Sequence, residues 1–127
     1  MKIASLVARL LLGLVFLVFG LNGFLHFIKG PMPTGIAGQF VAAIFASGYW
    51  VVIFAVQVIC GALFLVNRFV PLALVLIGPV IVNILAIHGL MGATAGLPLA
   101  FVVTVLWAIV AIRNKQHLAG IFVQRGE

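Results

Sequence analysis

Five polar residues interrupt the apolar stretches of this sequence and are its candidates for chemistry. Asn22 and His26 stand four residues apart in GLNGFLHF, so a helix would place them on one face. Gln57 and Asn83 lie in later apolar stretches, and His88 directly follows one of them. Amides donate and accept hydrogen bonds, and histidine can also release a proton near neutral pH. These residue types could therefore bind the polar head of a small molecule.

Acidic residues and thiols are nearly missing from the sequence. Glu127, at the C-terminal end, is the single acidic residue, so no apolar stretch offers a carboxylate for proton exchange. Cys60 is the single cysteine, which excludes an intramolecular disulfide and dithiol chemistry by this chain. The sequence also holds neither a metal-ligand cluster nor a nucleotide-binding motif. We therefore predict no catalytic residue and no metal site, and expect a non-catalytic subunit rather than a stand-alone enzyme.

The composition is that of a membrane protein. The 127 residues are 66% hydrophobic and 6% charged, whereas a soluble domain carries about 25% charged residues. Mean hydropathy is +1.44. We predict a single all-α domain over residues 1–127, an antiparallel four-helix bundle in the inner (plasma) membrane. Its helices are four apolar stretches near the roughly 20 residues that a bilayer core requires, at residues 6–28, 49–66, 69–87 and 97–112.

The basic residues predict the orientation of these helices. If the two termini share a compartment, all basic residues except Lys29 fall on one side of the membrane, and that side should be cytoplasmic. The formal charge of +6 would suggest nucleic acid for a soluble protein, but here it marks helix ends, so we expect the lipid bilayer and no nucleic acid as a partner. The residues on the cytoplasmic side are Lys2, Arg9, Arg68, Arg113, Lys115 and Arg125.

The connection after the first apolar stretch leaves two arrangements open. KGPMPTGIAGQF, residues 29–40, holds two prolines and three glycines and cannot be helical throughout. FVAAIFAS, which follows, is too short to span a membrane alone. It forms either a short interfacial helix at the outer leaflet, broken near Ser47–Gly48, or a straight extension of the second transmembrane helix back to Gly38. Further along, the tight Asn67–Arg68 link predicts a hairpin of the second and third helices.

The predicted topology brings the five polar residues toward one depth. A helix rises about 1.5 Å per residue, so Asn22, His26, Asn83 and His88 lie toward the outer side, and Gln57 lies near the middle of the membrane. Converging there, they would form a pocket for a polar head such as a quinone carbonyl. Alternatively, the amides tie helices together and the histidines sit among lipid headgroups. A b-type haem between the two histidines is disfavoured, because they differ in depth.

Small residues predict where helices approach each other closely. Gly13, Gly20 and Gly23 in the first helix, and Gly61 in the second, allow two backbones to come near. Pro79 should kink the third helix one turn before its amide and help to open space there.

Two segments of the chain carry a family resemblance. ARLLLGLVFLVFGLNGF, a proline- and glycine-rich loop and SGYWVVIFAVQVICGALFLVNRFVPLALVLIGPVIVNILAIH follow one another over nearly the whole sequence. In this order they resemble the DoxX family of small bacterial membrane proteins. Family members are associated with thiosulfate–quinone oxidoreduction or with thiol-redox partner proteins, so the resemblance implies a redox-linked membrane subunit.

Residues that match family positions include Asn22, Gln57, Asn83 and His88. Many members carry an acidic residue where this chain has Gln57, so the resemblance does not extend to proton-coupled chemistry. Our leading hypothesis is a DoxX-like subunit associated with electron transfer that binds a quinone or a similar head group. The alternative is a structural accessory subunit that packs against other membrane subunits of a larger energy-transducing complex.

Overall fold

Helices make up the structure wherever it is described. The computed structural model describes residues 2–26, 33–92, 94–123 and 126, and contains no strand among them. The four longer helices are α1 (Lys2–Leu25), α3 (Trp50–Val66), α4 (Val70–Gly89) and α5 (Leu97–Arg113). The shorter elements are α2 (Gly35–Ser47), the 3₁₀ turn η1 (Thr94–Gly96), α6 (Lys115–Leu118) and the 3₁₀ turn η2 (Ala119–Phe122). The prediction of an all-α chain is confirmed for these residues.

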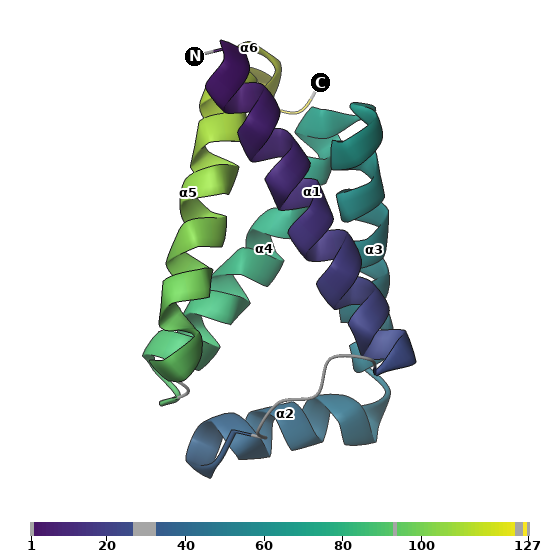
Figure 1. Cartoon of the computed structure of the whole chain (residues 1–127), viewed down its shortest axis with the longest axis vertical. Helices are drawn as coiled ribbons and strands as arrows, with labels where there is room; N and C mark the ends of the chain where they lie inside the picture. The colour runs from purple at the N-terminus through teal and green to yellow at the C-terminus, as the bar shows by residue number, and fades with distance from the viewer. Residues whose placement is uncertain (1, 27–32, 93, 124–125, 127) are drawn as a thin grey trace.

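The four longer helices pack against one another (Figure 1). α1 contacts α3 and α5, and α4 contacts the same two helices. Side chains from all four helices meet in one buried core, because each helix turns one apolar face inward. The largest fully buried members of this core are Leu12, Phe16, Phe64, Leu74 and Ile77.

The outward faces of the helices are apolar as well. Val82 is 65% exposed and Phe101 is 59% exposed, and many other large apolar side chains share this position. Three helical segments, α1, α4 and Thr94–Arg113, are long and apolar enough to cross a membrane, and a fourth is added if α2 and α3 count as one broken span. Apolar surface on this scale is unusual for a soluble monomer and is compatible with a membrane protein.

Glycine lets α1 and α3 approach each other closely. A Cβ atom placed on Gly61 would lie 2.5 Å from the backbone nitrogen of Leu17, and one on Gly13 would lie 2.9 Å from the Gly61 carbonyl oxygen. Both distances are shorter than van der Waals contact, so neither position has room for a side chain. Gly20 and Gly23 meet side chains of α3 in the same way. The predicted close approach at these glycines is confirmed.

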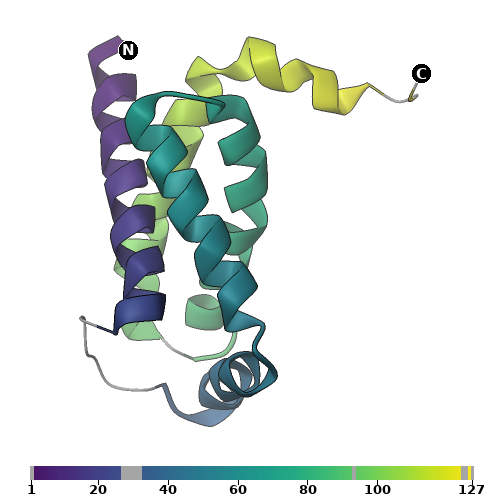
Figure 2. The same ribbon diagram turned by 90° about the vertical axis from the view of Figure 1, so that its right-hand side faces the viewer.

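A sharp bend separates α2 from α3. The axes of the two helices differ by 91°. Gly48 ends α2 at a φ of 80°, a left-handed conformation that glycine adopts readily. α2 therefore lies across one end of the longer helices, away from the end where the chain begins (Figures 1 and 2). The predicted break near Ser47–Gly48 is confirmed, and the alternative of a straight helix back to Gly38 is wrong.

Left-handed residues also form the turn between α3 and α4. Asn67, at a φ of 56°, follows the last residue of α3, and the backbone N–H of Arg68 donates to the Leu63 carbonyl over 3.1 Å. This is the hydrogen bond of a Schellman-type helix end. Phe69, at a φ of 52°, then precedes α4. The predicted tight link at Asn67–Arg68 is confirmed.

The first helix ends earlier than its apolar stretch suggests. α1 stops at Leu25, and His26 adopts a left-handed φ of 54° while its N–H donates to the Asn22 carbonyl over 2.7 Å. His26 is thus not a helical residue, although the sequence predicted a helix to Ile28. Other predictions fall on residues outside the described ones, namely Phe27, Ile28, Lys29 and the start of the connection after it, Arg125 and Glu127.

Candidate functional site

A cavity of about 400 Å³ lies between α2, α3 and α4. Its walls are mostly apolar, and Gln57 and Asn83 are the two amides among the lining residues. Pockets for small organic molecules usually have such a volume and such a lining, with a few polar groups that orient the ligand. α2 contributes four side chains whose spacing places them on one helical face, Phe40, Val41, Ile44 and Phe45.

The bend after α2 is fixed by local hydrogen bonds. The Ser47 hydroxyl donates to the Ile44 carbonyl over 3.1 Å, and the backbone N–H of Tyr49 donates to the Ser47 Oγ over 3.3 Å. These hydrogen bonds and the left-handed φ of Gly48 take the place of the backbone hydrogen bonds that a straight helix would form from α2 into α3. The bend therefore holds α2 where its apolar face forms one wall of the cavity.

Aromatic contacts join α2 to α1 and α3 beside the cavity. The Phe45 and Trp50 rings stack at a centroid distance of 6.0 Å, and Phe45 also packs against Phe54 at 6.1 Å. Phe24 of α1 lies 5.5 Å from Trp50. A Cβ atom on Gly23 would lie 2.2 Å from the Phe54 ring, so that glycine makes the space in which the ring sits. Phe45 and Phe54 both line the cavity, and this cluster holds them in place.

Gln57 places a buried amide in the cavity wall. The residue lies in the middle of α3 and is 7% exposed. Gly20 of α1 packs behind it, since a Cβ atom there would lie 3.0 Å from the Gln57 Cβ. No fully buried side-chain nitrogen or oxygen of the described residues lacks a hydrogen-bond partner, and Gln57 is among the residues that line the cavity, where its amide is available to a ligand. An accessible amide in a mostly apolar wall can donate to and accept from a ligand, so this group favours a molecule with a polar head in the cavity.

Asn83 supplies the second amide of the cavity. Its Nδ2 donates to the Pro79 carbonyl, one turn earlier in α4, over 3.0 Å. Pro79 lies within a continuous α4, so the helix is not broken there. An asparagine amide has two N–H donors and one carbonyl acceptor, and this hydrogen bond uses a single donor. Asn83 therefore retains a donor and an acceptor that a ligand could use.

The other three predicted residues do not line this cavity. Asn22 is half-buried in α1, and His26 is exposed beyond the end of that helix. His88 is half-buried near the end of α4, where a Cβ atom on Gly96 would lie 2.3 Å from the ring carbon Cε1. Of the five predicted residues, the structure thus brings Gln57 and Asn83 together in this cavity and leaves these three outside it. For Asn22 and His26 the reason is that α1 packs on the glycine side of α3, while the cavity lies on the side that faces α2 and α4. His88 lies further along α4 than the lining residues of that helix, against Gly96.

Sequence reasoning missed the contribution of α2. FVAAIFAS was predicted to be a short interfacial helix or an extension of the second transmembrane helix, but it was not assigned to the pocket, although its apolar residues at positions 40, 41, 44 and 45 have the spacing of one helical face. That spacing could have identified α2 as a wall of the cavity, because a helical face with large apolar side chains packs against other apolar groups.

The fold and the cavity together are compatible with a helical membrane protein that binds a small molecule. The described chain is helical, has three or four apolar helices compatible with a membrane, and encloses a mostly apolar cavity of ligand size with two amides. Comparisons with protein-family models, with curated proteins and with solved structures found no match to this chain. The chemistry of the cavity must therefore carry the functional inference.

Proposed function

We propose that the chain is a multi-pass inner-membrane protein whose cavity binds a quinone or a molecule with a similar carbonyl head group. In this proposal the protein is an antiparallel four-helix bundle with cytoplasmic termini, and α2 lies along the outer surface. The positions of the basic residues support this orientation. Lys2, Arg9 and Arg113 line a cavity at the end away from α2, and Arg68 lies in the α3–α4 turn at that same end.

The buried amide of Gln57 is the observation that carries the proposal. Quinone oxygens accept hydrogen bonds, and the Gln57 amide, which lines the cavity, has N–H groups that can donate them. A quinone carbonyl in the cavity could therefore accept a hydrogen bond from this amide. Asn83 of α4 offers a further donor, and the apolar side chains that line the cavity suit the ring and the tail of a lipid-soluble quinone.

The chain itself offers little for electron or proton transfer. Glu127 is its single acidic residue and Cys60 its single thiol. Electrons and protons for a bound quinone would thus come from a partner protein. This division of roles agrees with the expectation from the DoxX resemblance, in which the chain is a small subunit of a membrane redox system.

Binding of a short-chain ubiquinone to the purified protein tests the proposal. Quinones quench tryptophan fluorescence, and Trp50 packs against Phe45 and Phe54 in the cavity wall. We expect saturable quenching by the wild-type protein. Gln57→Leu, which keeps the volume but removes the hydrogen bond, should weaken binding roughly two- to tenfold, because a neutral hydrogen bond contributes about 0.5–1.5 kcal/mol.

Thr104→Val is the matched control for partition of the quinone into detergent. The Thr104 hydroxyl donates to the Ala100 carbonyl of its own helix over 2.8 Å, and Thr104 does not line the cavity. This variant should bind like the wild-type protein. Quenching that does not saturate, or that is equal in the Gln57 and Thr104 variants, would rule out the proposed role of the amide.

A structural accessory role is the second candidate, and the surface of α5 favours it. Of the helices that could cross a membrane, the segment Thr94–Arg113 has the smallest buried share, 17%. Phe101, Val102 and Val105 leave a broad apolar face that lipid or another subunit could cover. Gentle isolation from native membranes distinguishes the two functions. A stoichiometric partner without any extracted quinone supports the accessory role, and extracted quinone supports ligand binding.

A further inference from the structure

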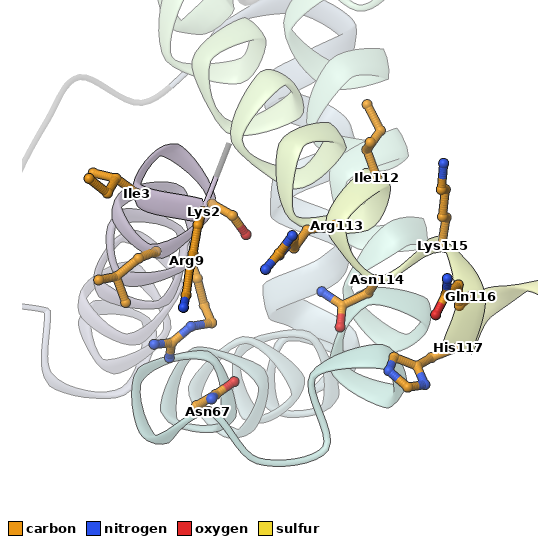
Figure 3. Close-up of a pocket in the computed structure, with 12 residues that line it drawn as sticks. Lys2, Ile3, Arg9, Asn67, Ile112, Arg113, Asn114, Lys115, Gln116 and His117 are labelled. Carbon is orange, nitrogen blue, oxygen red and sulfur yellow. The ribbon is translucent and has the colours of Figure 1, made fainter.

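A second cavity lies at the opposite end of the molecule, beside the first residues of α1. It measures about 840 Å³ and is formed by the start of α1, the α3–α4 turn, the end of α5 and α6. Figure 3 shows the Lys2, Arg9 and Arg113 side chains reaching the space between these elements, while Lys115 extends away from them. His117, Ser5 and the amides of Asn67 and Asn114 also line it.

The positive charge around this cavity has no acidic counterpart among the described side chains. Four lysine and arginine residues line it, Lys2, Arg9, Arg113 and Lys115. The single acidic residue of the sequence, Glu127, lies outside the described residues, so no described side chain can neutralise these cations. Grouped cations repel one another, and an anion bound among them would remove that repulsion.

Arg9 is fixed at the base of the cavity by the end of α3. Its Nη1 donates to the Phe64 carbonyl and, over 3.5 Å, to the Leu65 carbonyl. These carbonyls belong to the last turn of α3, where a helix leaves its acceptors without partners and where a cation is favourable. A guanidinium has five N–H donors, so Arg9 keeps donors for a ligand while its position is set. A held arginine loses less entropy on binding than a free one.

From this arrangement we infer that the cavity binds a phosphate-bearing anion. Arginine and lysine with neighbouring amide and hydroxyl donors form the usual environment of a phosphate group, and basic pockets between membrane helices bind phosphate headgroups of lipids. The general excess of positive charge on one side of a membrane does not account for the grouping. Arg68 is at the same end but is exposed and does not line the cavity.

Native mass spectrometry of the full chain in detergent tests this site. The probes are dioleoylphosphatidylglycerol, the zwitterionic dioleoylphosphatidylcholine and inorganic phosphate. We expect saturable binding of phosphatidylglycerol in preference to phosphatidylcholine. Arg113→Gln should weaken that binding about tenfold or more, since a hydrogen bond to a charged group contributes on the order of a tenfold change in affinity. Arg68→Gln removes the same charge at the same end and should change it less than about threefold.

The outcomes separate the sources of the anion. If inorganic phosphate binds with the same dependence on Arg113 and displaces the lipid, the site is supported and a soluble phosphate compound is its ligand. The inference would be overturned if the Arg113 and Arg68 variants weakened binding of phosphatidylglycerol equally. It would also be overturned if neither phosphatidylglycerol nor inorganic phosphate bound saturably. Lys2→Gln, on α1, gives a second variant of the same cavity in case Arg113→Gln lowers the unfolding midpoint. Quinone binding at Gln57 is measured separately, so the two inferences fail independently.

Discussion

Replacing Gly61 with alanine should loosen the contact between α1 and α3. A Cβ atom at this position would lie 2.5 Å from the Leu17 nitrogen and 2.8 Å from the Gly13 oxygen, and both are backbone atoms that cannot rotate away. The shorter distance falls about 0.9 Å below the 3.4 Å at which ordinary contact begins, so the helices must separate. Overpacking of this kind costs about 1–3 kcal/mol, and the higher helix propensity of alanine recovers up to about 1 kcal/mol. We therefore expect Gly61→Ala to lower the free energy of unfolding by up to about 2 kcal/mol.

Reversible unfolding in mixed micelles, followed by circular dichroism as sodium dodecyl sulfate is added, measures this loss. Gly78→Ala in α4 is the control, because nothing lies within 4 Å of a Cβ atom built there. That variant should be as stable as the wild-type protein, or more stable by up to about 1 kcal/mol. If the two variants unfold at the same point, or if Gly61→Ala is the more stable, the reasoning about close backbone approach is refuted.

Three further substitutions or modifications test the packing of the helices. Arg9→Met removes the donors to the Phe64 and neighbouring carbonyls, so it should lower the unfolding free energy by about 1.5–3 kcal/mol, and Arg68→Met should not. Trp107→Phe removes the 3.0 Å hydrogen bond from Nε1 to the Leu74 carbonyl of α4, so it should lower the unfolding free energy by at least about 0.5–1.5 kcal/mol in the same assay. An unchanged unfolding midpoint would show that this hydrogen bond contributes nothing. Cys60 is fully buried, so maleimide should label it in dodecyl sulfate but not in the folded state, and rapid labelling of the native protein would contradict the packing of α3.

The helices and their close contacts follow from simple features of the sequence. Long apolar stretches predicted the four longer helices, since a stretch near 20 apolar residues is typical of a membrane helix, which satisfies its backbone hydrogen bonds within itself. Gly13 and Gly61 predicted a close approach of α1 and α3, because a residue without a side chain lets two helix backbones come near each other. Gly48, after a serine, predicted the break before α3 because glycine adopts left-handed φ values without strain.

The membership of the site could not be predicted in the same way. The rise per residue gives the depth of a side chain, but the direction in which it points depends on which face of its helix is buried. Helices that are apolar on all sides carry little of that information, so Asn22 and His26 were placed with Gln57 on depth alone. In the structure α1 turns Gly20 toward Gln57, and the cavity opens on the other side of α3. The role of α2 depended on the 91° bend, whose angle no local pattern specifies.

Photolabelling with an azidoquinone is the most direct test of the central proposal that the cavity between α2, α3 and α4 binds a quinone. The labelled chain is digested and the modified peptides are identified by mass spectrometry. Label should appear on α2 and on the Pro79–Ile87 part of α4, should fall when excess short-chain ubiquinone is added, and should be reduced in Gln57→Leu. Label that spreads over the outward faces of α1 and α5, and that excess quinone does not displace, would contradict the proposal.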